Sequence, residues 1–112
     1  HALATLNDVT YVEAARALAE RIMEKGGEAP ASRIEIAFRL ATARNPSAAE
    51  SEILLKRLEA LKAHYAADTA AAAKLLKVGE RQRNPKLDPV EHAAYAGLCM
   101  LILNLDETIT RE

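Results

Sequence analysis

The sequence predicts an all-α protein, an orthogonal bundle of four to five helices. Three observations carry this prediction. Residues suited to helix N-termini open four segments, apolar residues recur within these segments at helical spacing, and no segment alternates apolar and polar residues as a strand does. The chain has 112 residues, so we expect one helical domain over residues 1–112.

Each of four expected helix starts has a Ser, Thr or Asp three residues before a Glu. In such a pair, the two side chains can accept hydrogen bonds from backbone amides that lack partners in the first helical turn. The pairs are Thr10 with Glu13, Ser32 with Glu35, Ser47 with Glu50, and Asp88 with Glu91. We therefore expect the first residue of each pair to cap a helix.

The first two helices are predicted over residues 10–25 and 33–44, each with one apolar stripe. The stripes consist of Val12, Ala15, Leu18, Ala19 and Ile22 in the first helix, and Ile34, Ala37, Phe38 and Ala41 in the second. The pattern places Arg16 and Glu20 away from the first stripe, where the two charges can pair one turn apart.

The third and fourth helices are predicted over residues 48–66 and 69–78. The third has a stripe of Leu and Tyr residues at helical spacing, and Asp68 is positioned to cap the fourth. Residues 80–87 have no periodicity and contain an Asn-Pro pair, so we expect a loop there.

The last helix is predicted to begin at Pro89 and to lie at the centre of the bundle. It contains an apolar run over residues 93–103, which leaves it apolar nearly all round. We therefore expect Leu98, Leu101 and Ile102 to be buried. The 11-residue run is too short to span a bilayer, so no membrane insertion by this domain is expected.

Composition limits both the core and the set of partners. Alanine accounts for 24 residues and aromatic residues for only 4%, which favours helices that approach closely over a deep core. The formal net charge is -1 and no aromatic residues are interleaved with the basic residues of the segment 81–86, so no nucleic-acid partner is expected. The basic residues Arg81, Arg83 and Lys86 are interpreted as a solvated loop.

No ligand set or catalytic motif is apparent. His1, His64 and His92 lack metal-ligand spacing, and the single Cys99 lies in an apolar run, as a buried small residue would. We therefore predict that the domain binds neither metal nor haem. Near the end of the chain, Asp106 and Glu107 are interpreted as charges that follow the last helix. An alternative is that Asn104 and Glu107 bind backbone groups and fix the C-terminal segment.

Several short sequence segments, taken together, resemble a known family. They are Leu6-Asn7-Asp8 followed by residues 11–21, residues 37–41 with 44–47, residues 75–80, and Leu103-Asn104-Leu105-Asp106-Glu107-Thr108. In this order and spacing they are similar to the C-terminal end of a planctomycete-type family of unknown function. Its members usually carry a secretion signal, a cytochrome c-like domain and two long domains of unknown function, and the present chain resembles the tail of the second.

The resemblance implies an extracytoplasmic parent protein in which haem is held only by an upstream domain. It supplies no catalytic residue for this tail. Asn7 and Asp8, and the segment from Asn104 through Asp106 to Glu107, belong to the family pattern and are compatible with structural capping. Other domains of the same parent are the expected partners.

We expect a structural or interaction module at the C-terminus of this exported protein. One alternative is a non-catalytic part of a redox or polysaccharide-degrading enzyme, and another is a carbohydrate- or small-ligand-binding module. A binding module should have a pocket with convergent polar groups. An interaction module should have an apolar patch. Whether the parent is an enzyme stays open.

The segment before the first helix predicts where such a patch lies. His1 to Leu6 is largely apolar, and Leu3 and Leu6 can share one face of a helical turn. In the parent we expect this segment to continue an upstream helix, and we expect an apolar or mixed patch that the parent covers. The chain by itself should form a homodimer through this region or fold the segment back.

Overall fold

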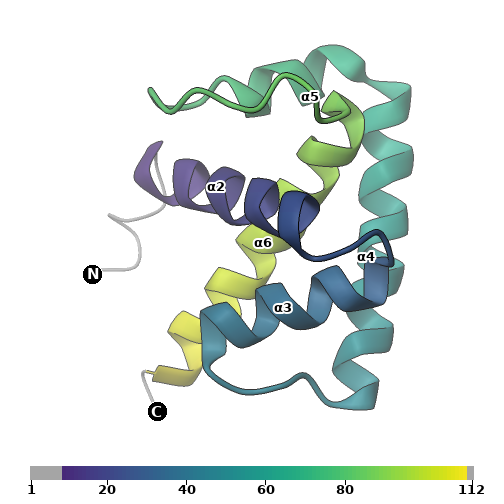
Figure 1. The fold of residues 1–112 in the computed structure, drawn as a ribbon, viewed down its shortest axis with the longest axis vertical. Coiled ribbons are helices and arrows are strands. Elements are labelled where there is room, and N and C mark those ends of the chain that lie inside the picture. Colours follow the sequence, from purple (N-terminus) through teal and green to yellow (C-terminus); the bar gives the residue numbers. More distant parts are fainter. Residues whose placement is uncertain (1–8, 111–112) are drawn as a thin grey trace.

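The computed structural model describes residues 9–110, with the backbone alone described over residues 106–110. It contains α2 (Val9–Lys25), α3 (Pro30–Thr42), α4 (Ala48–Ala67), α5 (Thr69–Leu76) and α6 (Pro89–Thr110) (Figure 1). Within residues 9–110 there is no strand, and the predicted all-α class is confirmed.

Helix α6 is the centre of the bundle, as the apolar run predicted. It packs against each of α2, α3, α4 and α5. Figure 1 shows it crossing the middle of the molecule behind α2, with α4 along one side. Leu98 and Ile102 are fully buried. The predicted burial of Leu101 is wrong: this side chain is 39% exposed, because it lines an open groove between α4 and α6.

Small residues let the other helices approach α6 closely. Ala93, Ala94 and Ala96 are fully buried. At Gly97, an added Cβ would lie 3.2 Å from a terminal methyl carbon of Leu61 on α4. The alanine-rich composition therefore gives a core of closely packed helices with few large side chains.

The start of α3 differs from its prediction. The helix begins at Pro30, three residues before the predicted start, because proline is already fixed in the helical range of φ at a first helical position. Ala29 precedes it without a side-chain cap. At its other end α3 stops at Ala43, which adopts a left-handed conformation with φ of 64°.

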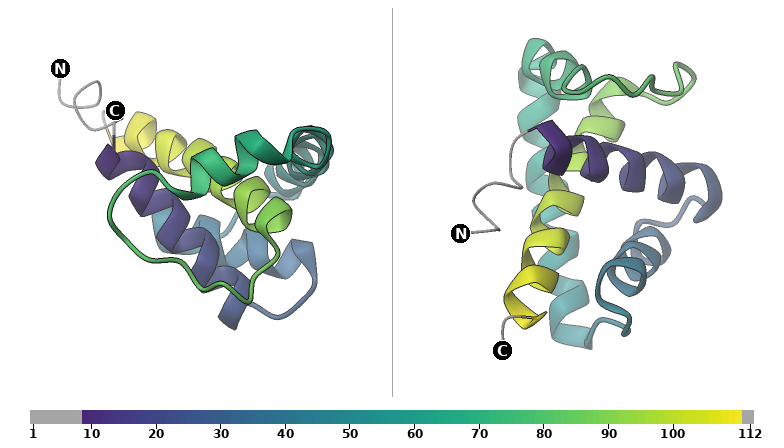
Figure 2. Two further views of the ribbon diagram at one scale, coloured as in Figure 1. Left: turned by 90° about the horizontal axis from the view of Figure 1, so that it is seen from above. Right: turned by 90° about the vertical axis from the view of Figure 1, so that its left-hand side faces the viewer.

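Residues 77–88 join α5 to α6 and run beside α2, as both views in Figure 2 show. This segment is irregular, as the sequence predicted, and the two helices that it joins, α5 and α6, pack against each other. Among the helices of the described residues, none combines the length and the hydrophobicity needed to cross a membrane.

Candidate functional site

Arg16 on α2 is buried and binds the loop that follows α5. Only 2% of the residue is exposed. Its guanidinium Nη1 donates to the carbonyl of Val78, and Nη2 donates to the carbonyl of Arg81 at 2.8 Å. The predicted placement of Arg16 on the solvent side beside Glu20 is therefore wrong. The side chain lies between α2 and the loop, where it reaches carbonyl groups that lack helical partners.

His92 in the first turn of α6 is also fully buried, and its ring contacts the backbone of Arg16. Arg83 Nε donates to His92 Nδ1 at 3.1 Å, so Nδ1 carries no proton. The other ring nitrogen, Nε2, lies 3.2 Å from the carbonyl oxygen of Arg16 and donates to it. Burial lowers the pKa of His92, and the nearby Arg83 lowers it further. The ring is therefore neutral and fixed in one tautomer.

Two further contacts fix the loop to α2. The Glu13 carboxylate accepts a hydrogen bond from the backbone amide of Arg81 at 2.7 Å, and Asn84 Nδ2 donates to Glu24 at 2.7 Å. Gly79, with φ of 88°, brings the loop so close that an added Cβ would lie 2.7 Å from the Glu13 carboxyl carbon. The loop is thus attached to α2 at Val78, Arg81 and Asn84. Arg81 and Lys86 are nevertheless exposed, as expected of a solvated loop.

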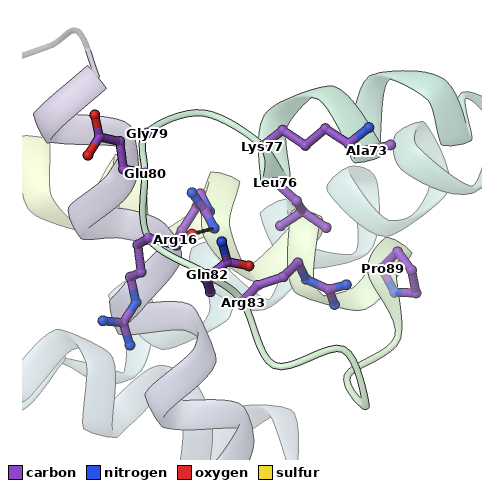
Figure 3. A pocket seen from close by; sticks show the side chains of 10 residues that line it. Arg16, Ala73, Leu76, Lys77, Gly79, Glu80, Gln82, Arg83 and Pro89 are labelled. Atoms are coloured by element: carbon purple, nitrogen blue, oxygen red, sulfur yellow. Dashed lines mark hydrogen bonds between the residues drawn. The ribbon is translucent and has the colours of Figure 1, made fainter.

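These contacts frame a pocket of about 370 Å³, which we call the cationic pocket. It lies between the end of α5, the loop and the first turn of α6 (Figure 3). Its lining consists of Arg16, Ala73, Leu76, Lys77, Gly79, Glu80, Arg81, Gln82, Arg83 and Pro89. Four of these residues are cationic and one is anionic, so the pocket can attract an anion.

A second hollow, which we call the apolar groove, has a volume of about 550 Å³. It is lined by Tyr11, Arg57, Ala60, Leu61, His64, Tyr65, Gly97, Met100, Leu101 and Asn104. The Tyr11 hydroxyl donates to the carbonyl of Met100, which holds the first turns of α2 at one edge of the groove. Leu105 lies one turn beyond Leu101 and is 41% exposed, so the apolar surface continues along α6.

The predicted caps behave in different ways. Ser47 forms both halves of its box: its hydroxyl accepts from the Glu50 amide, and Glu50 accepts from the Ser47 amide. Asp88 accepts from the Glu91 amide at 2.9 Å. Ser32 is not a cap, because α3 already begins at Pro30. Its hydroxyl instead donates to the carbonyl of Gly26 at the end of α2.

Thr10 is the second residue of α2 and not the residue before the helix. The predicted position of Asp106 and Glu107 after the last helix is also wrong, because α6 continues to Thr110. Asn104 lines the apolar groove from within the helix. The side chains of Asp106 and Glu107 lie outside the described residues, as do Asn7 and Asp8 altogether.

The single thiol group of the chain is not accessible to reactants in the folded protein. Cys99 is fully buried, and burial raises its pKa well above the usual range. Within the described part of the chain, no three His, Cys, Asp or Glu side chains are grouped as metal ligands would be. The expectation that the domain binds no metal and no haem stays a prediction.

Together, the fold and these surfaces describe a small helical domain with a cationic pocket and an apolar groove. Residues 1–58 match the family described as PSD1, protein of unknown function (DUF1553), and the chain belongs to this family. Of the sequence segments that resemble the planctomycete-type family, the first two lie within this match, and those from residue 75 onward lie beyond it. Searches of curated proteins and of solved structures found no match.

Proposed function

We propose that this domain is a structural interaction module whose apolar groove is covered by the segment His1–Leu6. The observation that supports the proposal is the apolar groove, in which Leu101 is 39% exposed and from which the apolar surface continues one turn along α6 to Leu105, which is 41% exposed. Singly exposed apolar side chains are ordinary in proteins, whereas a continuous patch beside a groove is a typical binding surface. The groove is lined by Tyr11 among other apolar side chains.

The segment His1–Leu6 is the occupant that the chain itself offers. It is joined to α2 only two residues before Val9, and the first turns of α2 are attached to α6 through Tyr11. Eight residues extend about 12 Å as a helix and about 26 Å when extended, so distance does not prevent them from reaching the groove. Leu3 and Leu6 would supply the apolar side chains.

The parent of this module is, in our proposal, an exported protein with a cytochrome c-like domain upstream. The resemblance of the sequence to the planctomycete-type family supports this part. In the parent, haem is held by the upstream domain alone, and the module contacts the other domains through the groove and the segment before α2. Haem absorbance that persists in the parent after this module is deleted would support the division of roles. Loss of haem on deletion would contradict it.

The double substitution Leu3→Glu with Leu6→Glu tests the proposed cover. Two partly buried leucines contribute about 1–3 kcal/mol in total, so the free energy of unfolding in urea should fall by that amount. The amide resonances of Leu61, Gly97 and Leu101 should shift, because these residues line the groove.

The matched control is Ala2→Glu with Thr5→Glu, which adds the same charge to the same segment but removes no leucine. It should change the stability by less than about 0.5 kcal/mol. If the protein is a strict monomer and the leucine variant is as stable as the unsubstituted chain, the proposal is wrong. A dimer in light scattering that dissociates on the leucine substitutions would assign the groove to a second copy of the chain and overturn the choice of occupant.

A further inference from the structure

The cationic pocket contains more positive charge than its neighbours neutralise. Among the described side chains, those of residues 9–105, the ion pairs are Arg33 with Glu91 and Arg44 with Glu50, and neither pair involves a residue of the pocket. A buried cation without a carboxylate partner is costly, since the charge has left water without gaining an opposite charge.

Arg16 is the most deeply buried of these cations. Its two terminal nitrogens bind loop carbonyls, and its Nε is buried with no hydrogen-bond partner among the described residues. Glu13 and Glu20 interact favourably with the charge from α2, but Arg81 and Arg83 oppose it from the loop. Arg16 therefore brings a buried cation with one unsatisfied N–H donor to the lining of the pocket.

The arrangement of the side chains in Figure 3 separates the charges by sign. Lys77 and Arg83 lie on either side of Leu76, Lys77 extending toward Ala73 and Arg83 toward Pro89, whereas Glu80 points away from them. The space between the two cations is therefore bounded by apolar surface from Leu76 and Pro89. Arg83 is held in this position by its bonds to the ring of His92 and to the backbone of the loop.

We propose that the cationic pocket binds a small organic carboxylate. Its carboxylate group would lie between Lys77 and Arg83, and its apolar body would lie against Leu76, Ala73 and Pro89. The volume of about 370 Å³ suits a molecule of this size. This site is separate from the apolar groove, so the inference goes beyond the proposed interaction module and does not depend on it.

Benzoate, with benzamide as its neutral analogue, is a suitable pair of probes. We expect benzoate to shift the backbone amide resonances of Lys77, Gln82 and Arg83 in a saturable titration, and benzamide to bind at least fivefold more weakly. Lys77→Gln should weaken benzoate binding about fivefold. Lys77 is exposed, and no hydrogen bond or ion pair of its side chain occurs among the described contacts, so the fold should be preserved.

Lys86→Gln is the matched control, because it removes the same charge from the same loop outside the pocket. It should change benzoate binding less than twofold. Three results would each overturn the proposal. They are equal effects of the two lysine variants, equal binding of benzoate and benzamide, and no saturation by 50 mM benzoate, a concentration that corresponds to a binding free energy of about 1.8 kcal/mol. Inorganic sulfate that binds more tightly than benzoate would replace the carboxylate assignment with a general oxyanion site.

Discussion

At the scale of single residues, two buried polar side chains connect the two halves of the chain. Arg16 and His92 lie on different helices, and each binds groups contributed by the other helix or by the loop between α5 and α6. The sequence contained a signal for Arg16: it lies four residues after Val12 and three before Ala19, on one face of α2. The loop carbonyls that it reaches were not predictable, because they lie more than 60 residues away in sequence.

Replacing Arg16 with methionine should destabilise the protein by about 2–4 kcal/mol. Methionine has a similar volume, but it leaves the carbonyls of Val78 and Arg81 without their charged donor. Urea unfolding followed by circular dichroism measures the change. Arg21→Met, on the exposed side of the same helix, should cost less than about 0.5 kcal/mol. Equal losses in the two variants would show that the bonds to the loop contribute little.

His92 should make the stability depend on pH. Because burial lowers its pKa below the ordinary value of 6.5, the unfolded chain binds more protons than the folded one between the two values. The free energy of unfolding is therefore at its highest above pH 6.5 and falls as the pH drops below it. Urea titrations between pH 7 and pH 5.5 measure this slope.

The variant His92→Gln isolates the contribution of the imidazole. Glutamine can accept a hydrogen bond from Arg83 and donate one to the Arg16 carbonyl, but it does not titrate. Its slope between pH 7 and pH 5.5 should be flatter than that of the unchanged protein. The Arg44 guanidinium lowers the pKa of the Glu50 carboxyl group to about 2, so this group changes the free energy of unfolding only at more acidic pH. An unchanged slope in His92→Gln would assign the pH dependence to other groups.

At the scale of the helices, local signals predicted most of the boundaries. The start of α4 follows from a capping box that needs only Ser47 and Glu50, and α5 follows from Asp68, which accepts from the Ala71 amide. The start of α3 was mispredicted because two local signals competed: Pro30 and Ser32 each favour a helix start. Proline set the boundary, and the serine hydroxyl turned to the end of the preceding helix.

The end of α3 offers a stabilising substitution. Ala43 adopts a left-handed conformation that costs an alanine about 1 kcal/mol relative to glycine. Ala43→Gly should therefore raise the free energy of unfolding by roughly 0.5–1 kcal/mol, measured by urea unfolding. Ala63→Gly, at an exposed interior position of α4, should lower it by a similar amount. Two changes of the same sign would contradict the role of the left-handed conformation.

At the scale of the whole molecule, the sequence predicted the central position of α6 but neither the pocket nor the groove. The apolar run was sufficient to place α6, because a helix that is apolar nearly all round must be covered on several sides. The cationic pocket depends on how residues 77–88 pass beside α2, which no local pattern determines. The partial exposure of Leu101 likewise depends on the path of α4 and on what covers it.

The position of α6 has a consequence for synthesis on the ribosome. The helix that contacts every other helix is also the last of the described helices to be made. At about 5–20 residues per second, α2 is complete roughly 4–17 s before the end of α6. Until then the apolar faces of the earlier helices have no central partner. The bundle therefore cannot fold stepwise from its first residue, and these faces must be protected from aggregation until translation of this region is complete.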